Sequence, residues 1–127
     1  MVWLAVGVGG ALGSMARHVV NMFFAHVLER SVPYATAAVN LVGSAVIGLL
    51  AAVIATGRVH MSPELRTFVF VGILGGFTTF SSFMLDTFTL GHGGEHALAF
   101  WNVALQIGFG LLAVWLGFRL GHAIGPP

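Results

Sequence analysis

The chain has 127 residues, of which 57% are hydrophobic and 7% are charged, and its formal net charge is +1. Soluble domains carry about 25% charged residues, so this composition indicates an integral membrane protein surrounded by lipid bilayer. A net charge this small provides no basic stripe, which argues against a nucleic-acid partner, and the absence of cysteine excludes disulfides and thiolate metal sites.

Apolar stretches long enough to cross a membrane, which takes about 20 helical residues for ~30 Å of hydrocarbon, occur four times. They cover approximately residues 2–28, where Arg17 interrupts the run, then 34–56, 65–90 and 97–121. Short polar or glycine-rich connections separate them. We therefore expect an all-α membrane protein, with four transmembrane helices forming a single domain over residues 1–127.

The arginines give the four spans almost no preferred orientation. Arg58, Arg66 and Arg119 lie on one side of the predicted bundle, and Arg17 and Arg30 lie on the other. Positive residues near span ends set the orientation of a membrane protein. Three arginines on one side against two on the other therefore predict that the chain inserts in both orientations. Two oppositely oriented copies would then form a two-fold symmetric pair. The alternative is that an excess of one arginine fixes a single orientation.

Small residues repeat at intervals of four in all four spans, a spacing that lets helix backbones approach closely in lipid. The pairs are Gly9–Gly13, Ser44–Gly48, Gly72–Gly76 and Gly117–Gly121. Each span therefore has a predicted packing face.

The third span contains GILGGFTTFSSFML at residues 72–85, with three glycines and four hydroxyl residues in an apolar run. Gly75, Gly76, Thr78 and Thr79 combine low helix propensity with hydroxyls that can bond freed backbone groups. This predicts a helix broken near the middle of the membrane, with exposed main-chain dipoles of the kind that bind ions in transporters. The alternative is an unbroken helix with a Ser/Thr-rich packing face.

Aromatic and amide side chains near this predicted break suggest an anion path. Phe80 and Phe83 are three apart on one helical face, and the positive edges of their rings could line such a path, although core or lipid packing is the commoner use of this spacing. Asn40, at the centre of the second span, offers N–H donors. Asn102 and Gln106, four apart on the fourth span, either line an ion path or hydrogen-bond between helices.

Three segments, GGALGSMAR at 9–17, AVNLVGSAVIG at 38–48 and GILGGFTTFSSF at 72–83, resemble the Fluc (CrcB-type) fluoride channels in order and over almost the whole chain. The resemblance implies passive, fluoride-selective efflux across the cell inner (plasma) membrane, which lowers cytoplasmic fluoride. It also implies an antiparallel dual-topology dimer of two copies of the chain. A structural sodium ion, Na+, would lie at the dimer centre, held by the backbone carbonyls of Gly75 and Thr78.

The same resemblance implies roles for individual side chains. The ring edges of Phe80 and Phe83 would face the fluoride ion, Asn40 would donate to it, and Thr79 or Ser81 would contribute to a track of hydroxyls.

Arg17 resembles the family's arginine near the end of the first helix, whereas Asp86, Ser82 and the fourth span depart from the family pattern. Arg17 would lie near a vestibule, and Asp86 stands at a pore mouth where the family usually has glutamate. Ser82 replaces a threonine, and the fourth span carries Asn102 and Gln106 where relatives have serine and threonine, so these two residues are the candidate pore wall.

The sequence predicts no enzyme, because it contains neither a phosphate-binding loop nor an HExxH motif, and its histidines are scattered near span ends. The principal rival is a small dual-topology multidrug or cation transporter, which would need a carboxylate inside the membrane. We expect Glu29, Glu64, Asp86 and Glu95 to lie away from the middle of any span. A non-conducting assembly subunit is a third class that composition leaves open.

Overall fold

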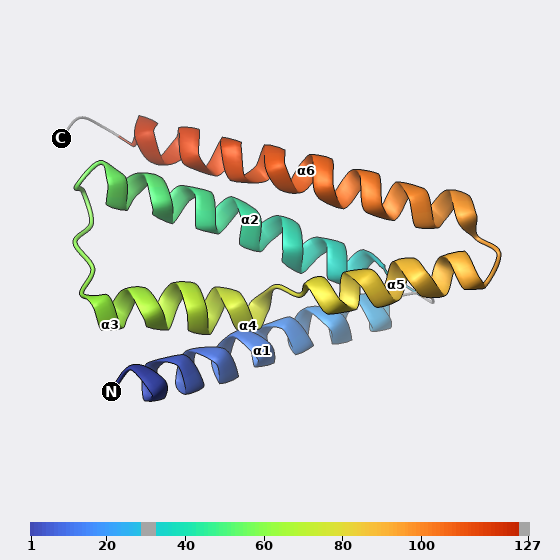
Figure 1. Ribbon diagram of the computed structural model, residues 1–127, viewed down its shortest axis with the longest axis horizontal. Helices are drawn as coiled ribbons and strands as arrows, with labels where there is room; N and C mark the ends of the chain where they lie inside the picture. Colours follow the sequence, from blue (N-terminus) through green and yellow to red (C-terminus); the bar gives the residue numbers. More distant parts are fainter. Residues whose placement is uncertain (29–32, 125–127) are drawn as a thin grey trace.

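The computed structural model describes residues 1–28 and 33–124, and every regular element within them is helical. Four long passes run back and forth, so that the start of the first pass, the end of the last pass and the loop around residue 60 lie together at one end of the molecule (Figure 1). The elements are α1 (Val2–Val27), α2 (Tyr34–Ala55), α3 (Pro63–Arg66), η1 (Thr67–Leu74), α4 (Gly75–Phe77), α5 (Phe80–His92) and α6 (His96–Ala123). The predicted all-α, four-helix architecture is confirmed, while the single-domain organisation stays a prediction. Glu29 and Arg30 lie outside the described residues.

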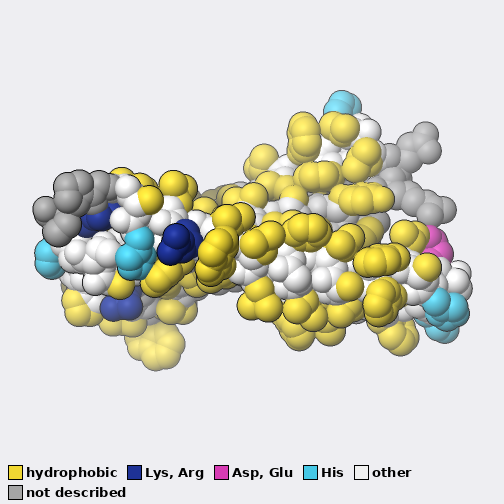
Figure 2. Space-filling model, turned by 90° about the horizontal axis from the view of Figure 1, so that it is seen from above, with side chains coloured by type: hydrophobic (Ala, Val, Ile, Leu, Met, Phe, Trp, Pro, Cys, Tyr) yellow, Lys and Arg dark blue, Asp and Glu magenta, His cyan; other side chains and the backbone are white. Residues whose placement is uncertain are grey.

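Three of the passes are long and apolar enough to cross a membrane, namely Tyr34–Ala55, Pro63–His92 and His96–Ala123. The remaining pass, α1, has sufficient length at 26 residues, but Arg17 and His18 make it less apolar. Apolar side chains dominate the sides of the molecule, whereas the arginines visible on the face in Figure 2 lie toward one end. Such a surface suits a bundle whose sides contact lipid and whose ends contact water.

The third pass is interrupted at Thr78 and Thr79, as the sequence predicts. Both residues have extended backbone conformations, with φ −82° and ψ 160° at Thr78 and φ −154° and ψ 114° at Thr79. The Thr79 side chain then begins α5 by accepting a hydrogen bond from the backbone N–H of Ser82 at 3.2 Å. The unbroken helix that the sequence left as an alternative is wrong.

The helical segment before the break is wider than an α-helix. Residues of η1 form a π-helix of 8 residues, in which each N–H bonds to the carbonyl five residues earlier. No sequence pattern indicated this geometry. π-Helical segments are rare, and those that do occur are often found at functional sites. This one leads directly into the break.

Backbone contacts hold this wide segment against α1. A Cβ atom added to Gly9 would lie 2.6 Å from the Phe68 carbonyl oxygen and 2.9 Å from Gly72 Cα, and one added to Gly76 would lie 2.6 Å from the Gly10 oxygen. Main-chain atoms cannot rotate away, so these positions require glycine. Gly76 therefore serves helix packing in addition to lying next to the break.

The second close pair is α2 with α6, which lie side by side in Figure 1. A Cβ on Gly48 would contact the Val114 backbone, and one on Gly121 would lie 2.8 Å from the Leu49 oxygen. Gly117 meets the Ala45 backbone in the same manner. The predicted packing role of the small residues in these two helices is confirmed for the glycines.

Candidate ion-conducting site

The break in the third pass is completed by a side chain from α2. Asn40 Oδ1 accepts a hydrogen bond from the Thr79 backbone N–H at 2.8 Å, and Asn40 Nδ2 donates to the Thr79 carbonyl oxygen at 3.1 Å. The amide thus pairs with both backbone groups of one residue, as a neighbouring strand would. Because unpaired backbone groups cost several kcal/mol in hydrocarbon, this pairing stabilises the interrupted helix.

Asn40 is also the first member of a line of hydrogen-bonded side chains, which we call the amide ladder: Asn40, Gln106, Asn102 and Thr87. Asn40 Nδ2 donates to Gln106 Oε1 at 3.0 Å, and Gln106 Nε2 donates to Asn102 Oδ1 at 2.8 Å. Asn102 Nδ2 then donates to Thr87 Oγ1 at 2.8 Å, and Thr87 Oγ1 donates to the Phe83 carbonyl oxygen at 2.8 Å. The three amide donors therefore point in the same sense, from the break toward Thr87, and the Thr87 hydroxyl donates back toward the start of α5.

The ladder joins three helices and lies inside the bundle. Asn102 and Gln106 are only 7% and 8% exposed, so their amides are shielded by neighbouring side chains. The sequence predicted each of these residues as a polar candidate but did not connect them to Asn40. It missed Thr87 altogether, although its position four residues after Phe83 in a helix was the available signal.

Hydroxyl groups gather at the start of α5. Thr79 Oγ1 donates to Ser82 Oγ at 3.0 Å and lies 3.4 Å from Ser81 Oγ. Three hydroxyls therefore lie within hydrogen-bonding distance at the break. Their role as a fluoride track stays a prediction.

The two predicted pore phenylalanines form an edge-to-face pair. Their ring centroids are 5.8 Å apart with an interplanar angle of 70°. Phe83 is 5% exposed, but Phe80 is 72% exposed and projects from the bundle. Within one copy of the chain, only one of the two rings is enclosed.

Arg17 reaches the break from α1. Its Nη1 atom donates to the Thr78 carbonyl oxygen at 3.4 Å, so the guanidinium lies beside one of the two carbonyls predicted to bind sodium. The other, that of Gly75, belongs to an exposed residue at the start of α4. The carbonyl end of a half-helix carries partial negative charge and offers only oxygen donors, which suits a hard monovalent cation.

Asp86 lies in the middle of α5, in the second half of the third pass. It is 8% exposed, and within the described residues its Oδ2 atom is buried with no hydrogen-bond partner. As expected, Asp86 lies away from the middle of the third pass, where Thr78 and Thr79 interrupt the helix, but its side chain is buried. Glu64 is in the short α3 and Glu95 precedes α6, so both lie at ends of passes.

Two cavities adjoin the ladder. The first, of about 370 Å³, is lined by Asn40, Thr79 and Phe80 together with Gly75 and Thr78. The second, of about 290 Å³, lies near the turn between α5 and α6. Its lining includes Tyr34, Glu95, Trp101, Asn102 and Gln106. Asn40 faces the first cavity and Gln106 the second, and the 3.0 Å hydrogen bond joins these two residues.

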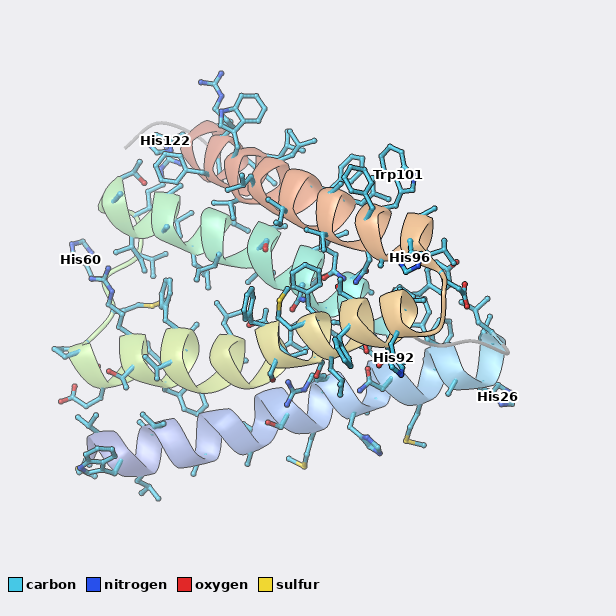
Figure 3. All side chains as sticks on the ribbon, turned by 45° about the vertical axis from the view of Figure 1, so that its right-hand side comes forward. His26, His60, His92, His96, Trp101 and His122 are labelled. Atoms are coloured by element: carbon cyan, nitrogen blue, oxygen red, sulfur yellow. The ribbon has the colours of Figure 1, made fainter. Side chains whose placement is uncertain are left out.

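Five of the six histidines lie at the ends of the bundle, whereas His18 lies within α1. His26, His92 and His96 are near one end and His60 and His122 are near the other (Figure 3). Among the described residues, no three His, Cys, Asp or Glu side chains are grouped so that they could hold a metal.

Residues 4–118 match the family described as CrcB-like protein, Camphor Resistance (CrcB). The chain belongs to the CrcB-like family. Among its relatives, "Fluoride-specific ion channel FluC 1" of Symbiobacterium thermophilum is 43% identical over 122 residues, covering 95% of this chain and 98% of that protein. "Fluoride-specific ion channel FluC" of Paramagnetospirillum magneticum is 43% identical and covers 92% of each chain. The protein of the same name in Hydrogenovibrio crunogenus is 40% identical over 98% of this chain and 93% of its own length.

Membership of the CrcB-like family agrees with the apolar helices, and the chain is a multi-pass protein of the inner membrane. It also accounts for the resemblance of the three sequence segments, which fall on α1, α2 and the broken third pass. The family match does not itself assign roles to single residues.

Proposed function

We propose that this CrcB-like protein is a fluoride-selective ion channel that lets fluoride leave the cytoplasm passively. The names of its relatives support this function. The structural observation that carries it is the amide ladder, a line of uncharged hydrogen-bond donors inside an apolar bundle.

Neutral donors suit this ion for a physical reason. Fluoride is small and strongly hydrated, so a selective path must replace several water molecules at once without holding the ion so tightly that it cannot leave. The carboxamides of the ladder and the hydroxyls at the break would offer such donors once their mutual hydrogen bonds open, and the edges of the Phe80 and Phe83 rings add partial positive charge. We expect conduction without any covalent step, hence no enzymatic activity.

A second copy of the chain in the opposite orientation would complete the site. Phe80 is 72% exposed beside the break, where an apolar ring and main-chain dipoles are open to a partner. In such a pair, sodium would be held by the carbonyls of Gly75 and Thr78 from both copies. There it would offset the negative ends of two half-helices.

The dimer has a direct test, because the natural chain lacks cysteine. A single cysteine replacing His60 should be labelled by a membrane-impermeant reagent in about half of the molecules if insertion follows the weak arginine bias. Labelling of all molecules, or of none, would exclude dual orientation.

The structural sodium ion has a separate test. Replacing sodium by N-methylglucamine should lower the temperature at which half of the dimer unfolds, and an unchanged unfolding temperature would exclude the structural ion.

Fluoride efflux from liposomes tests the function itself. Vesicles loaded with potassium fluoride and supplied with a potassium ionophore should release fluoride to an electrode within seconds, and vesicles loaded with potassium chloride should retain chloride. Absence of fluoride release from vesicles that contain folded protein would reject the proposal.

The cation-transporter alternative must be tested as well, because Asp86 is buried and proton exchange within a membrane needs a buried carboxylate. Proton-coupled uptake of a lipophilic cation, abolished by Asp86→Asn, would favour that alternative. Fluoride efflux without such uptake would exclude it.

A further inference from the structure

The two steps of the amide ladder beyond Gln106 could run in either of two directions. In the structure, Asn40 donates to Gln106, Gln106 to Asn102, and Asn102 to Thr87. A carboxamide presents an oxygen on one side and an N–H₂ on the other, so turning both Gln106 and Asn102 over exchanges donor for acceptor between Gln106 and Asn102 and between Asn102 and Thr87. Asn40 is held in place by its two hydrogen bonds to Thr79, so the same turn places an N–H of Gln106 opposite an N–H of Asn40. The Thr87 hydroxyl can follow, because its hydrogen rotates from the Phe83 oxygen to whichever acceptor faces it.

The observed direction is unsuited to an anion at Asn40. Gln106 presents its oxygen there, and the two N–H groups of Asn40 are already donated, one to Gln106 and one to the Thr79 carbonyl. An anion entering from the 370 Å³ cavity would meet a carbonyl oxygen and a saturated donor. In the reversed direction Gln106 would present N–H at the same place, and one N–H of Asn40 would be released.

We propose that fluoride binds between Asn40 and Gln106 by breaking their mutual hydrogen bond, and that the ladder reverses as it does so. This inference rests on the proposed channel function and adds a binding position and a switching element to it. Thr87 would then be a positioning residue. It would never touch the ion, but it would supply the hydrogen that lets Asn102 and Gln106 turn over.

Space and location support this binding position. The Asn40–Gln106 hydrogen bond joins a residue that lines the first cavity to a residue that lines the second, so it lies between the two cavities. Each side chain has a neighbouring cavity into which it can withdraw. The second N–H of Gln106 has no acceptor within the described residues, so the amide also keeps a donor for the 290 Å³ cavity.

The single glutamine of the chain allows a direct measurement. With side-chain ¹⁵N-labelled glutamine, the only carboxamide signals of this kind come from Gln106. Fluoride added to the protein in sodium-containing detergent solution should shift one of the two amide protons downfield, and chloride should leave both in place. Unchanged signals at fluoride concentrations that support efflux by the same preparation would overturn the proposal.

Thr87 variants separate switching from packing. Thr87→Val keeps the β-branched shape but removes the hydroxyl, and we expect at least a tenfold loss of fluoride efflux together with loss of the Gln106 shift. Thr87→Ser should restore both. Thr89→Val, an exposed threonine on the same helix, is the matched control and should keep wild-type efflux and the Gln106 shift. A Thr87→Val protein that retains the dimer, efflux and shift would refute the role of the hydroxyl.

The outcomes for the function and for the ladder are distinguishable. Failure of the wild-type protein to release fluoride rejects the channel function, whatever the amide signals do. Wild-type efflux without a Gln106 shift rejects only the reversal of the ladder.

Discussion

Replacing Gly9 by alanine should open the contact between α1 and the first half of the third pass. The added Cβ would lie 2.6 Å from the Phe68 oxygen, 2.9 Å from Gly72 Cα and 3.1 Å from the Ile73 nitrogen, whereas ordinary contact begins at 3.4 Å. All three atoms belong to the main chain, so the helices must separate by about 0.8 Å. A gap of this size loses roughly a quarter to a half of the dispersion energy of each contact between α1 and the third pass. Overpacking of this kind typically lowers the free energy of unfolding by about 1–3 kcal/mol.

Gly10→Ala is the matched control. It lies next to Gly9 on the same helix, yet an added Cβ there meets nothing within 4 Å. Alanine is about 1 kcal/mol better than glycine within a helix, so this variant should be neutral or slightly more stable. Thermal unfolding in detergent, followed by circular dichroism, should therefore rank Gly10→Ala at or above wild type and Gly9→Ala clearly below it.

The fluoride flux of the same pair tests whether this contact positions the break. Gly9→Ala should conduct less than Gly10→Ala, because η1 leads into the residues that line the 370 Å³ cavity. Equal stability of the two variants would refute the packing argument. Equal flux despite unequal stability would show that the break does not depend on α1.

Three further changes have expected outcomes. Phe80→Ile should depress fluoride efflux while the protein remains dimeric by sedimentation, because the polarised ring edge is lost; wild-type efflux would argue against that role. Thr79→Val removes the hydroxyl that caps α5 through Ser82 and should lower the unfolding free energy by about 1 kcal/mol, whereas Thr79→Ser should not; equal losses would discount the cap. Arg58→Ala removes hydrogen bonds of 2.7 and 3.2 Å to the last carbonyls of α6, and denaturant titration should show a loss of about 1–3 kcal/mol, with no loss contradicting the assignment.

The features that were predictable from sequence are those encoded within short segments. Two β-branched threonines after two glycines break a helix because of their own backbone preferences, and glycines four apart lie on one helical face because of the helical repeat. The break at Thr78 and the use of Gly9 and Gly72 as packing positions follow directly from these local rules, whereas the contact between these two glycines does not.

Contacts between distant segments were not predictable in the same way. Asn40 and Gln106 are 66 positions apart, so the pattern of either span alone cannot reveal that one amide donates to the other. The same holds for Arg17 and the Thr78 carbonyl, which are 61 positions apart. The sequence did not reveal the burial of Asp86 either, because its position at a predicted pore mouth suggested exposure, yet the structure buries it within α5.

Composition and local pattern alone determined that this chain is a broken-helix membrane bundle, because the cost of unpaired backbone and charge in hydrocarbon leaves few alternatives. Only the tertiary structure decided which polar side chains meet and in which direction they donate. That choice depends on how α2, α5 and α6 are placed relative to one another, and a hydrogen bond forms only where a donor and an acceptor come within about 3 Å.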